Sequence, residues 1–299
     1  MHAWESIQKV VDYIEGNIGD KIHLDELAKM ANLSYFYFHR LFSRLVKVSV
    51  QEYIKLRRLA HACEGLSDKS VRILDIALDC GFGGHETFTR AFKDAYGLTP
   101  SQFRNSPARL NHFDKPNLLL NYVMVDEGVP LITEGIVFEY NRKTLDEPIH
   151  FLGVKDFWQF KPGKMLGERP GVSEPAAIWD KFYTVADNIP CIPYGRRVGV
   201  SYSGGAPDGY STYFVGAEAS MDTVDTRFAS WWLPPREYIV CEYEAENFEQ
   251  LIASMGKMMK FTRTWLRQHG LRAIEFFPEI YYNRHDHAYM EMWLPFKKR

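Results

Sequence analysis

The stretch RILDIALDCGF, residues 72–82, decides the fold of the first hundred residues. Its apolar positions follow the i, i+3, i+4, i+7 spacing of one helix face: Ile73, Ile76, Ala77 and Cys80. The same spacing occurs 49 positions earlier, at Leu24, Leu27, Ala28 and Ala31. A turn residue follows each copy, Asn32 in the first and Gly81 in the second. The chain therefore contains an internal repeat.

The helix after each copy repeats as well, now at a distance of 50 residues. The corresponding apolar positions are Phe38, Leu41 and Phe42 in the first copy, and Phe88, Ala91 and Phe92 in the second. Two short helices that share one apolar face and meet at a tight turn are typical of a helix-turn-helix. We therefore predict an all-α region with two helix-turn-helix units in tandem.

The outer face of each second helix carries the side chains that a recognition helix would present to the major groove. In the first unit these are Tyr35, Phe36, His39, Arg40 and Ser43, and in the second His85, Glu86, Thr89, Arg90 and Lys93. Arginine at matching places suits bidentate contact with guanine or phosphate. A solvated polar face is the alternative, but two copies in register favour DNA reading.

Residues Val50–Leu66 connect the two units and have the pattern of one unbroken helix. At 1.5 Å per residue such a helix spans about 25 Å. That length suits two recognition helices held near the ~34 Å separation of successive major grooves. A single chain is thus expected to read two adjacent groove segments, with some bending of the DNA.

Residues 1–106 resemble the DNA-binding domain of the AraC/XylS family of bacterial transcription regulators. The second repeat contains the family signature IxxIAxxxGF within residues 72–82, followed by FTRAFKDAYGLTPSQFR over 88–104, and the connector contains YIKLRRLAHA. The resemblance implies base readers at Phe36, His39, Arg40, His85, Glu86, Thr87 and Arg90. It implies backbone contacts for Arg44 and Lys93. Lys47 and Val50 replace the Gly and Pro of the family's GxxP turn. Phe36 stands where such regulators often have Trp, and Glu86 where Gln is commoner, so the operator sequence stays open.

After a predicted linker at residues 107–117, the pattern changes to short strand-like runs, and we predict a second domain over 118–299. Two β-α-β-β units follow from the pattern: a strand at 149–158, a helix near 175–186 and strands at 197–203 and 211–219, then a strand at 236–245, a helix over 246–269 and strands at 278–283 and 288–295. Side by side they predict an α+β domain whose sheet has two helices on one face and a central concave cleft.

This second region resembles the GyrI-like effector-binding domain, which occurs in multidrug-sensing regulators and, in this domain order, in Rob-type members of the AraC/XylS family. Its most specific pieces are PEIYYN (278–283) and YMEMWLPF (289–296). The resemblance implies that a glutamate in the penultimate strand, here Glu279, lines a ligand site.

The residues themselves support a site at Glu279, because alternation places it on one strand face with Phe277 and Tyr281. A carboxylate among aromatic rings suits a lipophilic cation, since Coulomb attraction adds to ring-face contacts of about 0.5–2 kcal/mol each. Glu291 is a second candidate acid. The candidate walls are Trp158, Tyr202, Tyr213, Trp231, Trp232, Tyr281 and Trp293. Each aromatic residue has a core role as its alternative, and Glu279 an exposed place on a strand.

Several other chemistries find no support in the sequence. The four cysteines are scattered without a CxxC pair, which predicts neither a disulfide framework nor structural zinc. His285 and His287 have metal-like spacing in a predicted hairpin turn, without a third ligand. No phosphate loop, dinucleotide fingerprint or nucleophile elbow occurs. We therefore predict no cofactor, no metal and no catalytic residue.

Composition gives the setting. The 299 residues are 46% hydrophobic and 25% charged, as in an ordinary globular protein. The net charge of −2 means that DNA binding depends on where the cations lie. No apolar run approaches the ~20 residues of a membrane span, and no signal peptide is apparent, so a cytoplasmic protein without a membrane partner is expected.

The predicted function is that of a one-component transcription regulator, with activation as the expected sign. Its expected partners are double-stranded DNA, a small lipophilic or cationic effector, and RNA polymerase. Two alternatives concern the second domain. Glu279 could serve as the general base of a small-molecule hydrolase, or the domain could bind a protein and no ligand.

Overall fold

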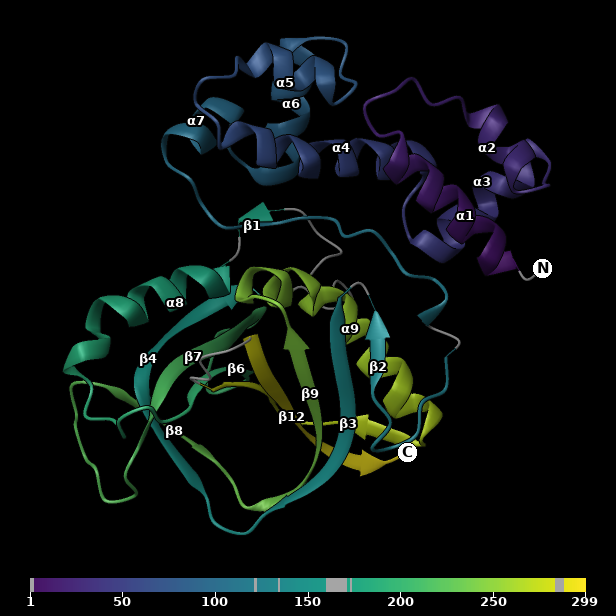
Figure 1. Cartoon of the computed structure of the whole chain (residues 1–299). Coiled ribbons are helices and arrows are strands. Elements are labelled where there is room, and N and C mark those ends of the chain that lie inside the picture. Colours follow the sequence, from purple (N-terminus) through teal and green to yellow (C-terminus); the bar gives the residue numbers. More distant parts are fainter. Residues whose placement is uncertain (1–2, 121–122, 134, 160–170, 173, 283–287) are drawn as a thin grey trace. The chain divides into compact units, whose positions relative to one another are not determined.

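The computed structural model describes residues 3–120, 123–133, 135–159, 171–172, 174–282 and 288–299. The chain divides into two compact units, each described by itself. The first comprises residues 1–123 and 165–173, and the second residues 124–164 and 174–299. Figure 1 follows the chain through both.

The first unit is helical, as predicted. Its helices are α1 (Ala3–Gly16), α2 (Leu24–Met30), α3 (Tyr35–Val46), α4 (Val50–Leu66), α5 (Ile73–Asp79), α6 (His85–Tyr96) and α7 (Pro100–Asn105). The pairs α2–α3 and α5–α6 are the two helix-turn-helix units, and α4 connects them over the predicted range (Figure 1). Both tight turns contain a residue in the left-handed region, Asn32 at φ 55° and Gly81 at φ 74°.

The helical unit has two apolar cores that share α4. Tyr53, Ile54 and Leu56 belong to the core of the first helix-turn-helix, and Leu59 and Leu66 to the core of the second. The arginines of α4 secure the surrounding chain. Arg57 forms a bidentate pair with Glu15, through Nε and Nη2 at 2.9 Å each. Arg58 donates to the carbonyl oxygens of Ile18, Asp20 and Gly81.

The residues expected to form a linker belong instead to the helical unit. We call residues 107–120 the strap. Phe113 is buried in the first core and accepts a hydrogen bond at its carbonyl from Arg57 Nη1, at 2.8 Å. The Leu118 amide donates to Gln8 Oε1 at 2.7 Å, and His112 Nδ1 lies 2.9 Å from Tyr96 Oη. Within the strap, β1 (Leu110–Asn111) pairs with β5 (Gly171–Val172). Burial of its apolar residues is the physical reason why the strap is not a free linker.

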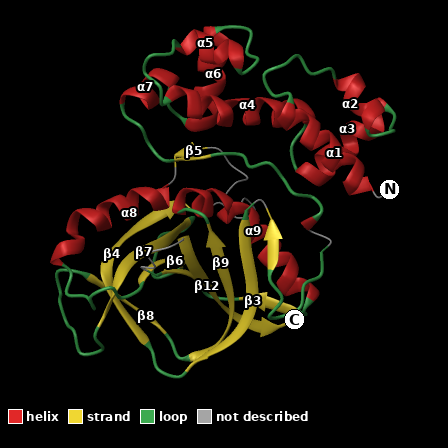
Figure 2. Cartoon of the chain, viewed as in Figure 1, coloured by secondary structure: helices red, strands yellow, loops and turns green. Residues whose placement is uncertain are grey.

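The second unit combines a large antiparallel sheet with two helices (Figure 2). Its elements are β2 (Leu131–Thr133), β3 (Ile136–Leu145), β4 (Ile149–Gln159), α8 (Glu174–Val185), a 3₁₀ turn (Ala186–Asn188), β6 (Arg197–Tyr202), β7 (Tyr210–Ala219), β8 (Ala229–Leu233), β9 (Arg236–Ala245), α9 (Phe248–Gln268), β10 (Leu271–Ala273), β11 (Phe277–Tyr281) and β12 (Ala288–Lys298). The two predicted β-α-β-β units are β4-α8-β6-β7 and β9-α9-β11-β12.

The strand order β3-β9-β12-β11-β6-β7-β4-β8 is symmetric about the seam between β11 and β6. Across this seam β11 corresponds to β6, β12 to β7, β9 to β4 and β3 to β8. Both helices cover the same sheet face: α8 packs on the face that carries Tyr213 and Val215, and α9 on the face that carries Tyr140 and Tyr243. The strand registers place these side chains on the same side as Glu279.

Strands β3 and β8, which the sequence did not predict, join the two halves. Only residues 146–148 separate β3 from β4, and only 234–235 separate β8 from β9. The pairing of Leu145 with Arg236 continues into that of Ile149 with Leu233, so these four strands form one long antiparallel ribbon. The ribbon connects the two ends of the strand order, and the sheet curls accordingly (Figure 2).

Candidate DNA-reading surface and ligand site

The first predicted recognition helix, α3, begins with an exposed aromatic group. Ser34 caps the helix by accepting from the Tyr37 amide. Phe36 is 77% exposed, and the rings of its neighbours Tyr35 and Tyr37 are exposed as well. Arg40 is exposed one turn later, with its guanidinium 5.9 Å from the centre of the Tyr37 ring.

Two further predicted contacts lie on α3. Arg44 is exposed in its last turn. His39 is half-buried, 4.4 Å from the Tyr35 ring between centroids, and its Nε2 has no hydrogen-bond partner among the described residues. The structure thus brings Phe36, Arg40 and Arg44 onto the solvent side and places His39 at its edge.

The second predicted recognition helix, α6, has a polar surface. His85, Glu86, Thr87, Arg90 and Lys93 are all exposed, while Phe88 and Phe92 are buried in the core beneath. Thr87 Oγ1 donates to the Gly84 carbonyl at 2.8 Å, so this hydroxyl is already engaged in the first turn of the helix. Arg40 and Arg90 lie at matching places of α3 and α6, 50 residues apart.

In the second unit, Glu279 lies at the seam of the sheet. Its Oε2 accepts from Tyr281 Oη at 3.0 Å and from Tyr213 Oη at 3.3 Å. Trp179 of α8 donates from Nε1 to Tyr213 Oη at 3.3 Å, and its ring meets the Tyr281 ring edge-on at 5.2 Å. Trp158 completes the aromatic group, with its ring 6.4 Å from that of Tyr213. We call these five residues the Glu279 site.

A glycine makes room for two side chains of the Glu279 site. Gly199 of β6 pairs with Glu279 across the seam. A Cβ at Gly199 would lie 2.6 Å from Tyr213 Oη and 3.0 Å from Trp179 Cζ2. Any larger residue at this position would therefore displace Tyr213, which donates to the carboxylate, and Trp179.

The electrostatics of the site follow from its burial. Burial raises the pKa of Glu279 to about 7, and the hydrogen bonds from Tyr281 and Tyr213 oppose the rise only partly. Burial and the nearby carboxylate also raise the pKa of both tyrosine hydroxyls well above the usual value, so they remain donors. Among the described residues no cationic side chain pairs with Glu279. The site can therefore hold one positive charge among aromatic rings.

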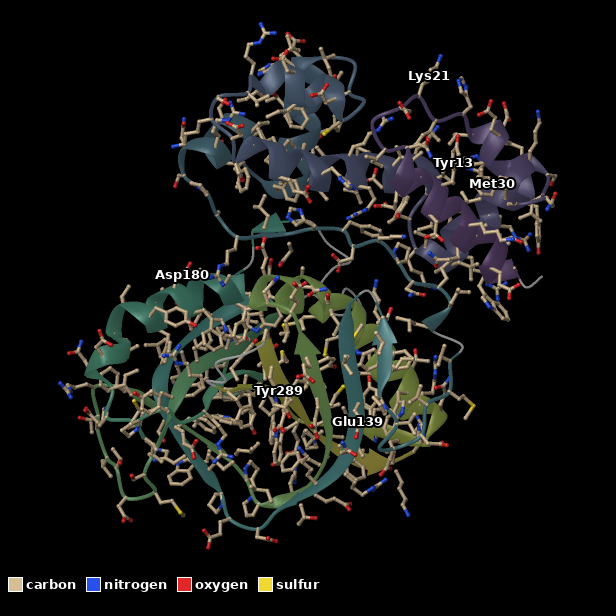
Figure 3. All side chains as sticks on the ribbon, in the orientation of Figure 1. Tyr13, Lys21, Met30, Glu139, Asp180 and Tyr289 are labelled. Carbon is tan, nitrogen blue, oxygen red and sulfur yellow. The ribbon has the colours of Figure 1, made fainter. Side chains whose placement is uncertain are left out.

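Glu291, the second candidate acid, lies on the opposite face of the sheet. It pairs in register with Ile280, whereas Glu279 pairs with Met292. Its carboxylate accepts from Lys143, Tyr282, Tyr289 and Trp293 at 2.6–2.9 Å. Although burial opposes ionisation, the hydrogen bonds from Tyr282, Lys143 and Tyr289 hold the pKa of Glu291 below its usual value. Figure 3 labels Tyr289 of β12 and Glu139 of β3, which lie on this face with β9 between their strands.

The other predicted walls also lie away from the Glu279 site. Trp231 and Trp293 are buried in the core on the face of Glu291, and Tyr202 packs against that core. Trp232 stacks on His150 at 4.1 Å between ring centroids. The structure thus corrects the expectation of a single pocket: only Trp158, Tyr213 and Tyr281 join Glu279. Register between strands, which a single sequence does not show, decides this division.

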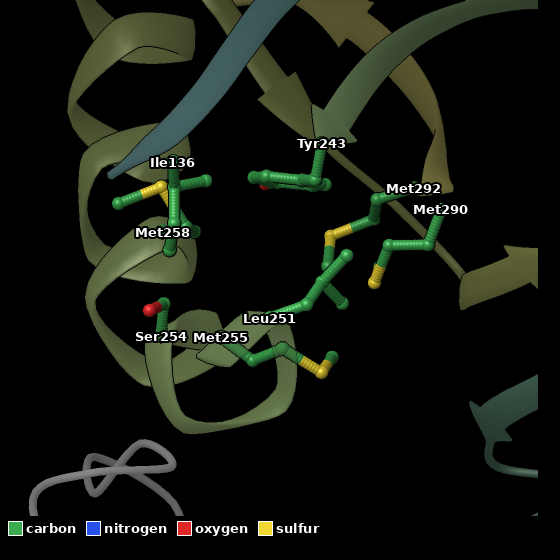
Figure 4. A pocket seen from close by; sticks show the side chains of 8 residues that line it. All are labelled: Ile136, Tyr243, Leu251, Ser254, Met255, Met258, Met290 and Met292. Atoms are coloured by element: carbon green, nitrogen blue, oxygen red, sulfur yellow. The ribbon is translucent and has the colours of Figure 1, made fainter. Parts of the chain in front are cut away.

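A small pocket lies between α9 and the sheet (Figure 4), and its Met292 pairs in register with Glu279. Its lining residues are Ile136, Tyr243, Leu251, Ser254, Met255, Met258, Met290 and Met292. Sequence reasoning missed these residues and Trp179. The sequence shows Trp179 and the α9 methionines only as members of apolar helical stretches, a pattern that core residues share.

The described residues contain no group of three His, Cys, Asp or Glu placed to hold a metal ion, and the His285–His287 motif lies outside them. Nor does any described helix combine the length and apolarity needed to cross a bilayer.

Comparisons with known proteins complete these observations. A family model described as a helix-turn-helix domain matches residues 27–106. The right origin-binding protein of Escherichia coli K12 is 35% identical over 203 residues, which cover 60% of this chain and 68% of that protein. The HTH-type transcriptional activator AarP of Providencia stuartii is 30% identical over 105 residues, covering 35% of this chain and 78% of its own. The solved structure of SAV2435 bound to tetraphenylphosphonium is similar over 53% of this chain and 94% of its own, at 17% identity and a TM-score of 0.41.

Proposed function

The chain belongs to the AraC/XylS family of transcription regulators, with a GyrI-like domain at the C-terminal side, and from this membership we propose that a small lipophilic cation controls its action on DNA. The helical unit reads DNA with α3 and α6. The second unit binds the cation at the Glu279 site. Because AarP is by name a transcriptional activator, we extend activation to this chain.

For DNA reading, the support is the exposure of Arg40 and Arg90 at matching places of the two recognition helices. Arginine in the first half of such helices suits guanine O6 and N7 or a phosphate. The aromatic Phe36 suits apolar contact with a thymine methyl group, and the carboxylate of Glu86 accepts only from an exocyclic amine such as cytosine N4.

The observation that carries the ligand proposal is the carboxylate of Glu279, which has two phenol donors and four aromatic rings around it but no cationic partner among the described residues. Ionisation of a buried carboxyl without a counter-ion costs free energy, and burial accordingly raises the pKa of Glu279. A lipophilic cation supplies the missing charge and covers the rings. For regulation, the cation must bind two states of the protein with different affinities.

The test measures binding of tetraphenylphosphonium and of the neutral triphenylphosphine oxide to the full chain by calorimetry. We expect Glu279→Gln to lower the affinity for the cation by at least tenfold and to leave the affinity for the neutral compound nearly unchanged. Glu237→Gln, an exposed glutamate of the same unit, is the matched control.

The pH dependence has a defined sign. Below pH 7 the Glu279 carboxyl is protonated and offers no charge, so the affinity for the cation falls as the pH is lowered. Between pH 8 and pH 6 a pKa of about 7 predicts a loss of about tenfold, absent in Glu279→Gln. Equal cation binding by both proteins at every pH would reject the proposal. Conversion of a reactive compound to its water adduct would favour the hydrolase alternative instead.

A further inference from the structure

The methionine pocket beside the Glu279 site has no role in the function proposed above. It lies between α9 and the strands β3, β9 and β12, and four of its eight lining residues are methionines: Met255, Met258, Met290 and Met292 (Figure 4). All four side chains are buried. The pocket contains about 10 Å³ of free space, roughly that of one water molecule.

The polar atoms of the lining are already engaged. Ser254 Oγ donates to the Gln250 carbonyl at 2.8 Å within α9. The Tyr243 hydroxyl lies 3.1 Å from Thr262 Oγ1. No other side chain of the lining carries an oxygen or nitrogen atom. The pocket is therefore suited to an apolar group and offers nothing to a polar one.

Three residues of the pocket lining neighbour residues of the Glu279 site. Met292 pairs in register with Glu279, and Met290 pairs with Tyr281, so both methionines stand beside the site on the same sheet face. From the helix side, Met255 Sδ lies 4.0 Å from Tyr281 Oη. A ligand arm that runs from Glu279 along this sheet face toward α9 would therefore meet Met290, Met292 and Met255.

We infer that the methionine pocket takes the apolar arm of the same ligand, so that the effector is an amphiphilic cation with a flexible arm. This inference rests on the proposed function and adds the shape of the ligand to it. Methionine has an unbranched and polarizable side chain, which can move aside and then contact whatever enters. A pocket that is nearly filled by methionines therefore opens for arms of different length, whereas a rigid aliphatic lining would not.

The test uses alkyltrimethylammonium ions with methyl, butyl, hexyl and octyl chains, below micellar concentrations, on the full chain. Each additional buried methylene is expected to raise the affinity by up to about fourfold. Ser254→Leu fills the pocket and is expected to remove this dependence on chain length while the tetramethyl compound still binds. Ala253→Leu places the same bulk on the exposed side of α9 and is the matched control.

A second measurement does not depend on how Ser254→Leu folds. In the wild-type chain labelled at its methionine methyl groups, octyltrimethylammonium is expected to shift the resonances of Met255, Met258, Met290 and Met292, and tetramethylammonium only those nearest Glu279. Affinities that depend on Glu279 but not on chain length, with no such shifts, would overturn the pocket inference alone. Affinities that do not depend on Glu279 at all would instead reject the proposed function.

Discussion

At the scale of single residues, two glutamates one register position apart lie on opposite faces of the sheet and have different surroundings. Glu291 accepts from four donors, one of them Lys143, so its charge is compensated by side chains of the same domain. Among the described residues Glu279 receives hydrogen bonds from two phenols and has no cationic partner, and burial raises its pKa. A buried carboxylate with a cationic partner stabilises a fold, whereas one without such a partner is a candidate for ligand binding.

Arg90 provides the corresponding test on the DNA side. We expect Arg90→Ala to weaken binding to a specific operator by about 1–3 kcal/mol, because a bidentate contact of that strength is lost while the buried face of α6 is untouched. The measurement is a titration of operator DNA selected from a random library, with circular dichroism to verify the fold. Arg227→Ala, an exposed arginine of the second unit, controls for the loss of one positive charge. An unchanged affinity and footprint would place DNA on a different face.

Alternation within one strand was enough to predict that Glu279 and Tyr281 share a face, since period 2 is a property of the strand itself. It was not enough to place Glu291 or Trp293, because their face relative to Glu279 depends on how β12 pairs with β11. Trp179 comes from a helix far away in the sequence, and no local pattern marks it as part of the site.

At the scale of elements, the two helix-turn-helix turns solve one problem with different residues. Both require a left-handed residue between helices, and the chain uses Asn32 in one and Gly81 in the other. Asn tolerates this conformation through local hydrogen bonding. At Gly81 the Arg58 side chain also leaves no room, because an added Cβ would lie 2.6 Å from its guanidinium carbon.

We therefore expect a substitution at Gly81 to destabilise the fold and a change of Asn32 to glycine to leave it nearly unaffected. Gly81→Ala should lower the free energy of unfolding by about 1–2 kcal/mol through left-handed strain, with a further loss as Arg58 is displaced from its three carbonyls. Asn32→Gly keeps the conformation accessible and should change stability by less than about 0.5 kcal/mol. Urea unfolding of the full chain, followed by circular dichroism, measures both. Equal effects would show that the turn conformation does not limit stability.

The elements that sequence reasoning predicted best are those with a strong period and clear ends, such as α4 and β9. Strands β3 and β8 were missed because neither belongs to the repeated β-α-β-β pattern: β3 pairs with β9, and β8 pairs with β4. The pattern near Trp231 and Trp232 shows aromatic residues but not that they continue a ribbon.

At the scale of the whole molecule, the domain boundary is where sequence and structure differ most. The segment after residue 106 is polar and contains two prolines before residue 117, a composition that is typical of a linker. Yet Phe113 and Leu118 enter the first core, while Leu110 and His112 contact the second core and Tyr96. Two apolar residues are too few to register as a pattern, although they are enough to hold the strap against the helices.

The strap therefore makes a prediction about stability that a linker would not. Phe113 is 4% exposed, and Phe113→Ala should lower the free energy of unfolding of the helical unit by about 3–5 kcal/mol, because it leaves a cavity beside Tyr53. Leu119 lies in the same strap but is 42% exposed, so Leu119→Ala should change stability far less. The measurement is urea unfolding of the full chain, monitored by circular dichroism at a wavelength that helices dominate. If the two substitutions had the same small effect, residues 107–120 would behave as a linker after all, and the two helix-turn-helix units would depend on α4 alone for their connection.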